Sequence, residues 1–278
     1  MSLQVSVEGG RAATPAETLL KAGQLGEALQ ALTAQVRGNP ADAAARVFLF
    51  QLLAASGQWE RAATQLEAGR ELDAGNAVLA AVYGPLLDAE RTRQKVFSGA
   101  ELPTLLGEPE AWMALLLQAL RLDAQGLHDQ AAQLRAQAFE QAPATAGRID
   151  DAPFAWLADA DPRFGPCLEM VANGRYGWAP LAHVAALDFD PPQALCDTLW
   201  APVRVTWRNG GQVPAFVPAR YPGSENADED ALRLGRRTDW TELGAGTWAG
   251  LGQRMLATDA GDHPLLDVRR IVFDLDLG

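Results

Sequence analysis

Apolar residues recur at helical spacing through the first half of the chain. Between residues 25 and 36 they occupy positions i, i+3, i+4, i+7 and i+11, which lie on one face of a helix. These positions hold Leu25, Ala28, Leu29, Leu32 and Val36. Residues from about 15 to 142 are rich in Ala, Leu and Gln, and we predict a series of helices there, each burying one face.

The helical half also carries an internal repeat. The second signature glycine lies 34 residues after the first, and the third lies one residue more than two such periods after the second. Each glycine is followed five residues later by an alanine. A glycine can end a helix in the left-handed conformation, and a small alanine lets the next helix approach closely. The signature residues, which look like those of tetratricopeptide repeats (TPR), are Gly23, Ala28, Gly57, Ala62, Gly126 and Ala131.

The copies of the repeat differ in quality. Pro40 and Pro143 lie seventeen residues after the first and last signature glycines, where a proline ring would end the second helix. The copy near residues 91–99 has lost its signature, and prolines and a glycine then break the chain before a helix predicted for residues 111–125. We predict two good repeats, one degenerate helix pair and a further good pair ending near Gln141.

The pattern changes after about residue 145. Six of the eight tryptophans lie beyond residue 150, among many glycines and prolines and short runs of alternating apolar and polar residues, which predict strands. Residues 203–217 indicate a hairpin, because Asn209-Gly210-Gly211 supplies the positive φ angles of a tight turn. We also predict a short helix over residues 164–173 and a last strand over residues 268–275.

The predicted fold class is therefore α+β. TPR-like helical repeats would occupy residues 14–145, and a smaller strand-rich domain would occupy residues 150–278.

Composition narrows the partners and the compartment. The net charge is −12, which would repel nucleic-acid phosphates and anionic lipids, so we expect neither nucleic acid nor a membrane as partner. Two cysteines, Cys167 and Cys196, are too few for a disulfide framework and favour a reducing compartment. The first residues lack the pattern of a secretion leader, and no apolar run approaches the roughly 18 residues that span a bilayer. We expect a cytoplasmic protein.

Residues that carry chemistry are scattered. His128, His183 and His263 lack the spacing of a zinc site. The Asp159-Ala160-Asp161 sequence has the spacing of a cation-binding DxD motif, but Pro162 follows at once and favours a structural turn. Glycines over residues 244–252 lack GxGxxG spacing and indicate a tight loop. We predict no catalytic, cofactor-binding or metal site.

Two further groups have alternative interpretations. The arginines at 233, 236, 237 and 254 could bind a carboxylate or phosphate, but the acidic second half favours internal ion pairs. The aromatic residues Tyr176, Trp178 and Phe189 could form an exposed patch for a partner, although burial is the commoner use of such side chains.

Four phrases in the second half carry a family resemblance. They are DADPRFGPCLEMVANGRYGWAPL (residues 159–181), YPGSE (221–225), LRLGRRTDW (232–240) and GLGQRML (250–256). In this order and spacing they resemble the ImpE/TagJ family of bacterial type VI secretion accessory proteins, and the resemblance covers about residues 15–275. We expect structural roles for the family-phrase residues, with the charged ones as buried polar pairs: Asp161, Arg163, Tyr176, Trp178, Tyr221, Arg237, Asp239, Trp240 and Arg254.

The resemblance implies a non-enzymatic protein without a cofactor. Members of the family are linked to the contractile sheath, through the N-terminal segment of the small sheath subunit (TssB type), and to the ClpV-type AAA+ ATPase that recycles contracted sheath. A generic TPR scaffold or chaperone for another secretion component is the alternative. A small-molecule enzyme is a third hypothesis, and it would require Asp159, Asp161, His183 and Arg254 to converge on one deep pocket.

A docking role also agrees with the repeat. Stacked helix pairs leave a concave face that accepts a helix or an extended peptide. The first helices of the units would line it, at residues 15–22, 42–55, 76–87 and 111–125.

Overall fold

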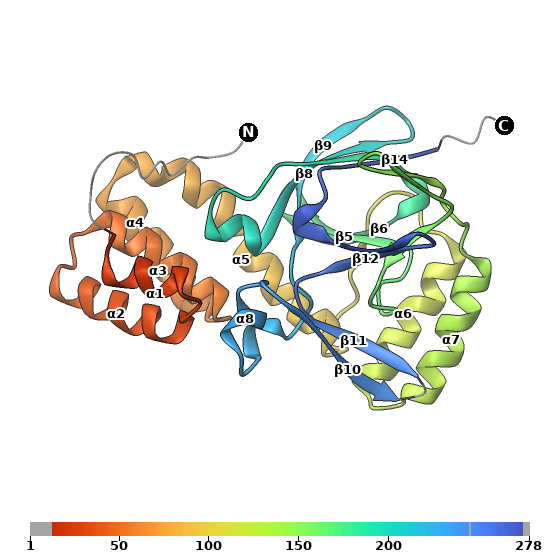
Figure 1. Ribbon diagram of the computed structural model, residues 1–278, viewed down its shortest axis with the longest axis horizontal. Coiled ribbons are helices and arrows are strands. Elements are labelled where there is room, and N and C mark those ends of the chain that lie inside the picture. Colours follow the sequence, from red (N-terminus) through yellow and green to blue (C-terminus); the bar gives the residue numbers. More distant parts are fainter. Residues whose placement is uncertain (1–12, 245, 275–278) are drawn as a thin grey trace.

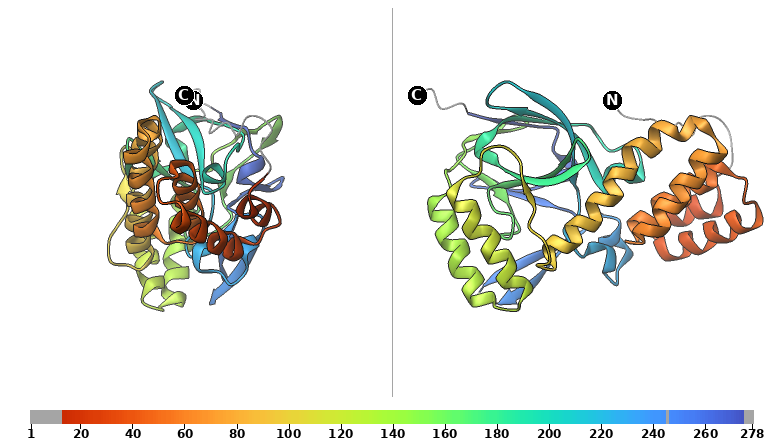
Figure 2. Two further views of the ribbon diagram at one scale, coloured as in Figure 1. Left: turned by 90° about the vertical axis from the view of Figure 1, so that its left-hand side faces the viewer. Right: turned by 180° about the vertical axis from the view of Figure 1, so that it is seen from behind.

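The structure is a computed structural model that describes residues 13–244 and 246–274. Helices form its first half, and those up to the start of α5 gather at one side of the molecule, whereas α6 and α7 lie beside the strands (Figures 1 and 2). The helices are α1 (Pro15–Lys21), α2 (Leu25–Gly38), α3 (Ala43–Ala55), α4 (Trp59–Leu72), α5 (Ala77–Phe97), α6 (Ala111–Ala124) and α7 (His128–Gln141).

The repeat signature has the predicted geometry. Gly23, Gly57 and Gly126 adopt φ angles of +84°, +68° and +75° and separate the helices of three hairpins, α1–α2, α3–α4 and α6–α7. The signature alanines of all three hairpins are fully buried (Ala28, Ala62 and Ala131). Helices α2 and α7 each end two residues before the predicted proline.

The predicted degenerate pair and the continuous groove are wrong. Helix α5 is one uninterrupted helix of 21 residues that contains Pro85. It carries the chain away from α1–α4, so the α6–α7 hairpin lies against the strands instead of continuing the stack (Figure 2). On α7, Arg135 donates a hydrogen bond to Thr247 in a strand, at 3.0 Å. The concave face therefore ends at α5.

Strands form most of the second half. In the largest sheet the order is β1-β6-β5-β9-β8-β7-β14-β2-β3, and two smaller sheets have the orders β13-β12-β4 and β10-β11. The strands of the large sheet are β1 (Thr104–Leu105), β2 (Gly147–Ile149), β3 (Ala152–Phe154), β5 (Cys167–Ala172), β6 (Arg175–Pro180), β7 (Val184–Phe189), β8 (Trp200–Trp207), β9 (Gln212–Pro218) and β14 (Arg270–Phe273).

The smaller elements complete the second half. The remaining strands are β4 (Leu157–Asp159), β10 (Thr238–Gly244), β11 (Thr247–Gly252), β12 (Met255–Thr258) and β13 (Gly261–Pro264). The short helices are η1 (Ala74–Asn76), η2 (Leu181–His183), η3 (Leu195–Thr198), η4 (Ser224–Asn226), α8 (Asp230–Arg233) and η5 (Leu265–Asp267). The predicted hairpin is confirmed as β8–β9. The tight glycine loop predicted over residues 244–252 is wrong for most of its length, because Thr247–Gly252 form strand β11, paired antiparallel with β10. Strand β14 confirms the last strand, whose predicted end at Leu275 lies outside the described residues.

The helix predicted over residues 164–173 is wrong, because most of this segment is strand β5. It pairs antiparallel with β6 from Cys167↔Pro180 to Ala172↔Arg175. All of Cys167 to Val171 is buried. Both faces of β5 are covered, one by the sheet's own core and the other by α5, so the segment lacks the polar–apolar alternation that identifies a half-exposed strand.

Two hydrophobic cores lie on the two faces of the large sheet. The first joins the helices to residues of the outer face, where the ring of Tyr83 on α5 lies 5.6 Å from Phe50 and 6.0 Å from Trp200. The second lies within the strand-rich half. The aromatic residues that could have formed an exposed patch are buried, which confirms the core interpretation (Tyr176, Trp178 and Phe189). A domain boundary between residues 145 and 150 stays a prediction, and the first core contains residues from both sides of it.

A late segment reaches back to the first helices. We call residues 220–236 the clasp segment, which contains η4 and α8 and lies beside the helical turns (Figure 1). Asp230 accepts a hydrogen bond from the backbone N–H of Gly26 at 3.1 Å, and Arg236 donates to the carbonyl of Leu20 at 2.9 Å. The side chain of Glu225 packs directly against Gly57. The turns of both N-terminal hairpins are thus covered by the chain itself.

Candidate functional site

A network of buried charges joins α5 to the strands. Arg93, 4% exposed on α5, donates to both carboxylate oxygens of Glu169 on β5, at 2.8 and 2.9 Å. It also donates to the backbone carbonyl of Arg220 at 2.8 Å. Arg254, between β11 and β12, donates to Asp159 Oδ2 at 2.6 Å and pairs with Glu169 as well. Two guanidinium groups therefore hold Glu169 between the helix and the sheet.

Aromatic side chains complete this network. The Tyr176 hydroxyl donates to Glu169 Oε1 at 2.6 Å and accepts a hydrogen bond from Trp178 Nε1 at 2.9 Å. The Tyr221 hydroxyl donates to Asp159 Oδ1 at 3.0 Å. Buried polar groups are costly without partners, and here each finds one. These family-phrase residues serve the junction between helices and strands.

Burial and pairing shift the pKa values of these groups in different directions. Burial would raise the pKa of Glu169, but the charges of Arg93 and Arg254 outweigh it and hold that pKa below its usual value. Burial raises the pKa of the Asp159 carboxyl to about 7, although Arg254 opposes the shift. Burial also raises the pKa of Glu90 on α5. The junction thus contains one firmly ionised carboxylate and two that hold a proton more readily.

The DxD sequence forms a structural turn, as predicted. Asp159 Oδ1 accepts a hydrogen bond from the backbone N–H of Asp161 at 2.8 Å. Asp161 in turn accepts from the backbone N–H groups of Arg163 and Gly250, both at 2.9 Å, and pairs with the Arg163 side chain. Both carboxylates are occupied by the protein. Through the hydrogen bond from Gly250, the turn that follows β4 is also joined to β11.

The prediction of buried polar pairs is wrong for two residues on β10 and the segment before it. Arg237 and Asp239 pair at 3.2 Å, but their side chains are 45% and 59% exposed. Arg237 also pairs with Glu229 at 2.9 Å. Trp240 is half-buried, with its ring 5.6 Å from that of Tyr221. The phrase LRLGRRTDW therefore contributes its apolar residues to the core and leaves these charges at the surface.

Internal pairing of the arginines is confirmed for three of the four. Arg233 pairs with Asp230 at 3.4 Å, and Arg237 and Arg254 have the partners given above. Arg236 departs from the prediction, because it binds backbone carbonyls of the first hairpin in place of a carboxylate.

The four residues of the enzyme hypothesis do not converge on one deep pocket. His183 bonds with Glu110 at 2.8 Å. Arg254 and Asp159 border a void of about 20 Å³, which has room for about one water molecule. Asp161 is fully buried. Over residues 13–244 and 246–274, no group of three or more His, Cys, Asp or Glu side chains has the arrangement of a metal site.

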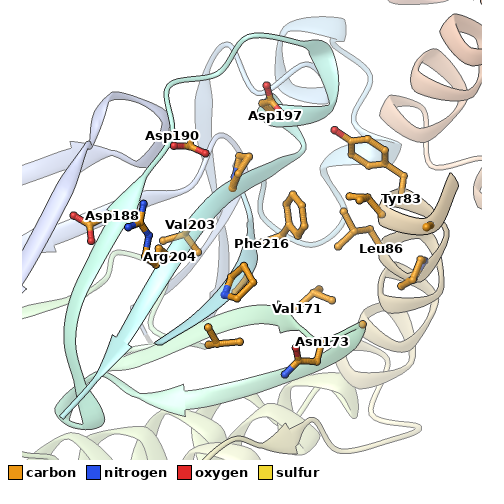
Figure 3. Close-up of a pocket in the computed structure, with 18 of the residues that line it drawn as sticks. Tyr83, Leu86, Val171, Asn173, Asp188, Asp190, Asp197, Val203, Arg204 and Phe216 are labelled. Atoms are coloured by element: carbon orange, nitrogen blue, oxygen red, sulfur yellow. The ribbon is translucent and has the colours of Figure 1, made fainter. Parts of the chain in front are cut away.

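An open groove lies beside this junction, where α5 diverges from the large sheet. Its volume is about 550 Å³. Leu86 and Tyr83 on α5 lie across from Phe216 on β9 and Val171 on β5 (Figure 3). The remaining apolar lining comes from Ala81, Val82, Pro85, Pro202, Val203, Val213, Pro214 and Ala215. An apolar groove of this size can accept several side chains of a bound peptide.

The charged residues of the groove come from β7, β8 and the segment between them. Asp188, Asp190 and Asp197 follow one another along β7 and the segment after it, with Arg204 of β8 beside Asp188 (Figure 3). Asp188 and Arg204 are cross-strand partners in the β7–β8 pairing. Asp188 also pairs with Arg270 at 3.2 Å, and the carboxylate of Asp197 accepts hydrogen bonds from the backbone N–H groups of Gln193 and Ala194 at 2.8 and 2.9 Å. The α5 residues that line the groove carry no charge.

The comparisons with known proteins agree with both halves of the chain. Residues 151–272 match the sequence model of the ImpE protein family, and residues 19–84 match that of the tetratricopeptide repeat. The type VI secretion system accessory component TagJ of Pseudomonas aeruginosa is 49% identical over 266 residues, which cover 95% of this chain and 93% of TagJ. The chain belongs to the ImpE/TagJ family of type VI secretion accessory proteins. A crystal structure of protein VPA1032 from Vibrio parahaemolyticus is similar, with a TM-score of 0.87 and 25% identity over 95% of this chain and 99% of that protein.

The groove lies where the two matched regions meet. The tetratricopeptide match ends at residue 84, within the part of α5 that forms the apolar wall, and the ImpE match contains the strands that form the other wall. The recognised ImpE/TagJ phrases contain only three groove residues, at positions 171, 173 and 174. They mainly mark the buried network and the glycine turns, among which Gly165, Gly174, Gly235 and Gly252 all have positive φ.

Sequence reasoning missed the carboxylates that line the groove and its β8–β9 side. The available signal was weak: Asp188 and Asp190 alternate with buried Leu187 and Phe189, which indicates two sheet faces. It does not show that α5 leaves one of those faces uncovered. Among the described residues, no helix has the length and hydropathy required to cross a membrane.

Proposed function

We propose that this protein is a non-enzymatic, cytoplasmic accessory component of type VI secretion that binds the N-terminal segment of the small sheath subunit (TssB type). In this role it would influence recycling of contracted sheath by the ClpV-type AAA+ ATPase. Two things support the proposal: membership of the ImpE/TagJ family and the open groove between α5 and the large sheet.

The groove is the observation that carries the binding role. Its apolar side chains come from a repeat helix and from ImpE strands, so it requires the complete fold. Helix-in-groove recognition uses such a surface, because an amphipathic helix buries one apolar face and leaves the other in water. The charged groups of the junction are buried and paired with one another, and they join α5 to the sheet.

Calorimetric titration tests the proposal directly. We expect the full-length protein to bind a peptide of about 20 residues that corresponds to the start of the small sheath subunit. As a helix, such a peptide would be about 30 Å long. A peptide of the same composition in scrambled order is the control. Absence of heat, together with an unchanged thermal midpoint at high peptide concentration, would refute sheath binding.

The link to the ATPase has a separate test. If peptide binding is found, addition of the protein to contracted sheath should change the rate at which the ClpV-type ATPase disassembles it. A rate that stays unchanged at saturating protein would limit the function to binding. Binding of a different secretion component with no binding of sheath would identify a general scaffold.

A further inference from the structure

We propose that a second cavity, between the C-terminal end of α7 and strand β4, binds a short, uncharged segment of a partner protein as an added strand. We call it the α7–β4 cavity. Its volume is about 390 Å³, and among the described residues none lines both this cavity and the groove beside α5. Binding there goes beyond the proposed function. Three features of the cavity indicate this ligand: a free strand edge, a buried hydroxyl without a partner and an apolar lining without a free charge.

Strand β4 has one free edge. It is the last strand of the sheet β13-β12-β4. The backbone N–H of Ala160 donates to Met255 of β12 at 3.0 Å, whereas that of Asp159 donates to the carbonyl of Gly165 at 2.8 Å, away from β12. Backbone groups of successive residues face opposite edges of a strand, so those of Leu157 share the edge of Asp159. Within residues 13–244 and 246–274, no strand pairs with Leu157 on this side.

This free edge borders the α7–β4 cavity. Leu157, Asp159 and Gly165 all line it. The ring of Phe139 on α7 closes the end near Gly165, because a Cβ at Gly165 would lie 2.4 Å from that ring. Trp156 lines the cavity at the other end of β4, directly before Leu157. The cavity therefore runs along the strand between two aromatic side chains.

A buried hydroxyl in the same cavity has no partner. Thr145, which lies between α7 and β2, lines the cavity and is only 5% exposed. Its Oγ1 makes no hydrogen bond to any of the described residues. A buried hydroxyl is costly to leave unpaired, so a ligand that supplies the missing partner gains affinity. Each residue of a peptide backbone offers one acceptor and one donor, and a hydroxyl can use either.

The lining selects uncharged groups. Phe139 and Trp156 are 38% and 41% exposed, which is unusual for such large apolar side chains. Asp159 is the one ionisable side chain among the described lining residues, and Arg254 and Tyr221 already pair with it. A charged ligand group would lose its water there without gaining a partner. Small or apolar side chains form most of the remaining surface, including Ala158, Ala160, Ala257, Pro162 and Pro166.

An extended peptide satisfies all three features together. Strand addition supplies main-chain hydrogen bonds at Leu157, and a pocket beside the edge accepts every second side chain. The alanines of β4 and β12 leave room for one large apolar side chain between the rings of Trp156 and Phe139. A helix uses its backbone groups internally, so it would leave the edge and the Thr145 hydroxyl unpaired.

Selection from a library of random hexapeptides displayed on phage identifies ligands of the full-length protein. We expect the enriched sequences to be uncharged and to share one large apolar residue, such as Phe, Leu or Ile. Each enriched sequence is then synthesised with acetylated and amidated ends, and its Kd is measured by calorimetric titration. Absence of enrichment, or enrichment of charged sequences only, would overturn the proposal.

Two variants test the cavity as the binding site. Trp156→Ala removes one of the two rings, and its control is Trp248→Ala, which removes a 47% exposed tryptophan on β11 outside the cavity. Thr145→Val removes the unpaired hydroxyl and keeps the shape of the side chain, and its control is Thr241→Val on exposed β10. We expect Trp156→Ala to raise the Kd about tenfold or more and Thr145→Val to raise it about fivefold, with both controls unchanged.

The stability of the free protein separates a binding role of Thr145 from a structural one. Because the hydroxyl has no internal partner, Thr145→Val should leave the thermal midpoint of the unliganded protein unchanged or higher while it weakens peptide binding. A lower midpoint would show that the hydroxyl serves the fold and would overturn its part in the site. Circular dichroism checks that all four variants fold.

Peptides with single N-methyl amides test strand addition. A methyl group removes an N–H and blocks pairing, so it should abolish binding at alternate residues of the peptide and be tolerated between them. Equal losses at every residue, or at none, would overturn the added strand.

The sheath peptide distinguishes this site from the proposed function. It should bind Trp156→Ala and Thr145→Val as it binds the parent, whether or not the hexapeptides bind. Loss of sheath binding in these variants would overturn the separation of the two surfaces. Hexapeptides that bind the parent and both cavity variants equally would overturn the α7–β4 cavity as a site and leave sheath binding intact.

Discussion

Removal of Arg93 should separate α5 from the sheet more effectively than any surface change on that helix. Arg93→Met keeps the length of the side chain and removes its charge. The substitution deletes two hydrogen bonds to Glu169 and one to the carbonyl of Arg220. Glu169 is fully buried, so it cannot regain water as a partner.

The expected loss follows from what remains. Breaking a buried ion pair by removing one partner costs about 3–5 kcal/mol, since the other charge stays buried. Glu169 keeps Arg254 and the Tyr176 hydroxyl, which places this case toward the lower end, at about 3 kcal/mol. The pKa of Glu169 should rise at the same time, because one of the two guanidinium groups that lower it is gone.

Urea unfolding followed by tryptophan fluorescence measures this loss. The matched control is Arg91→Met, two residues earlier on α5, where the arginine pairs with Glu60 and Asp88 at the surface. Exposed pairs contribute about 0–1 kcal/mol, so this variant should unfold close to the parent. If Arg93→Met also unfolded at the parent's urea concentration, the network would not be what holds α5 on the sheet.

Three further predictions concern the repeats and the junction. Ala28→Trp or Ala62→Trp should lower the free energy of unfolding by about 1–3 kcal/mol through overpacking, with Ala34→Trp on the exposed face as control, and a parent-like melting curve would contradict close helix packing. Gly57→Ala should destabilise more than Gly126→Ala, because both need positive φ but only the first would place a Cβ within 2.5 Å of the Glu225 side chain; equal melting temperatures would contradict that contact. The carboxyl of Asp159 has a pKa of about 7 in the folded chain and 3.8 in the unfolded chain, so between these pH values the folded state binds the extra proton. The free energy of unfolding should therefore fall as the pH rises from about 4 to 7, by at most about 1.4 kcal/mol per pH unit. Asp159→Asn should remove that contribution to the slope in urea titrations at several pH values, and an unchanged slope would refute it.

Local rules were sufficient where a residue has one conformational task. A glycine between two helical stripes needs only positive φ, and an alanine five residues later needs only to be small, so Gly23, Ala28, Gly57 and Ala62 were predictable from spacing. The hairpin at Asn209-Gly210 has the same character. The α+β division followed from the change in hydrophobic period near residue 145.

Tertiary contacts decided what spacing could not. Leu168, Glu169 and Met170 favour helix by intrinsic propensity, yet they form β5, because Glu169 finds its partner on α5, 76 residues earlier in the sequence. The third unit was predicted as a degenerate helix pair, but α5 is one helix that continues through Pro85 to Phe97. The groove lies where α5 diverges from the large sheet, and no local spacing in the sequence indicates that divergence.

The clasp segment has a consequence for how the chain matures. The first hairpin is held by Asp230 and Arg236, whose partners Gly26 and Leu20 precede them by more than 200 residues. During synthesis the early helices must wait for these residues to emerge before their turns are covered. Contacts of such high sequence separation slow folding and leave the early hairpins open to other proteins meanwhile. The repeats therefore form in the order of translation, and the clasp segment covers their turns only after it has been synthesised.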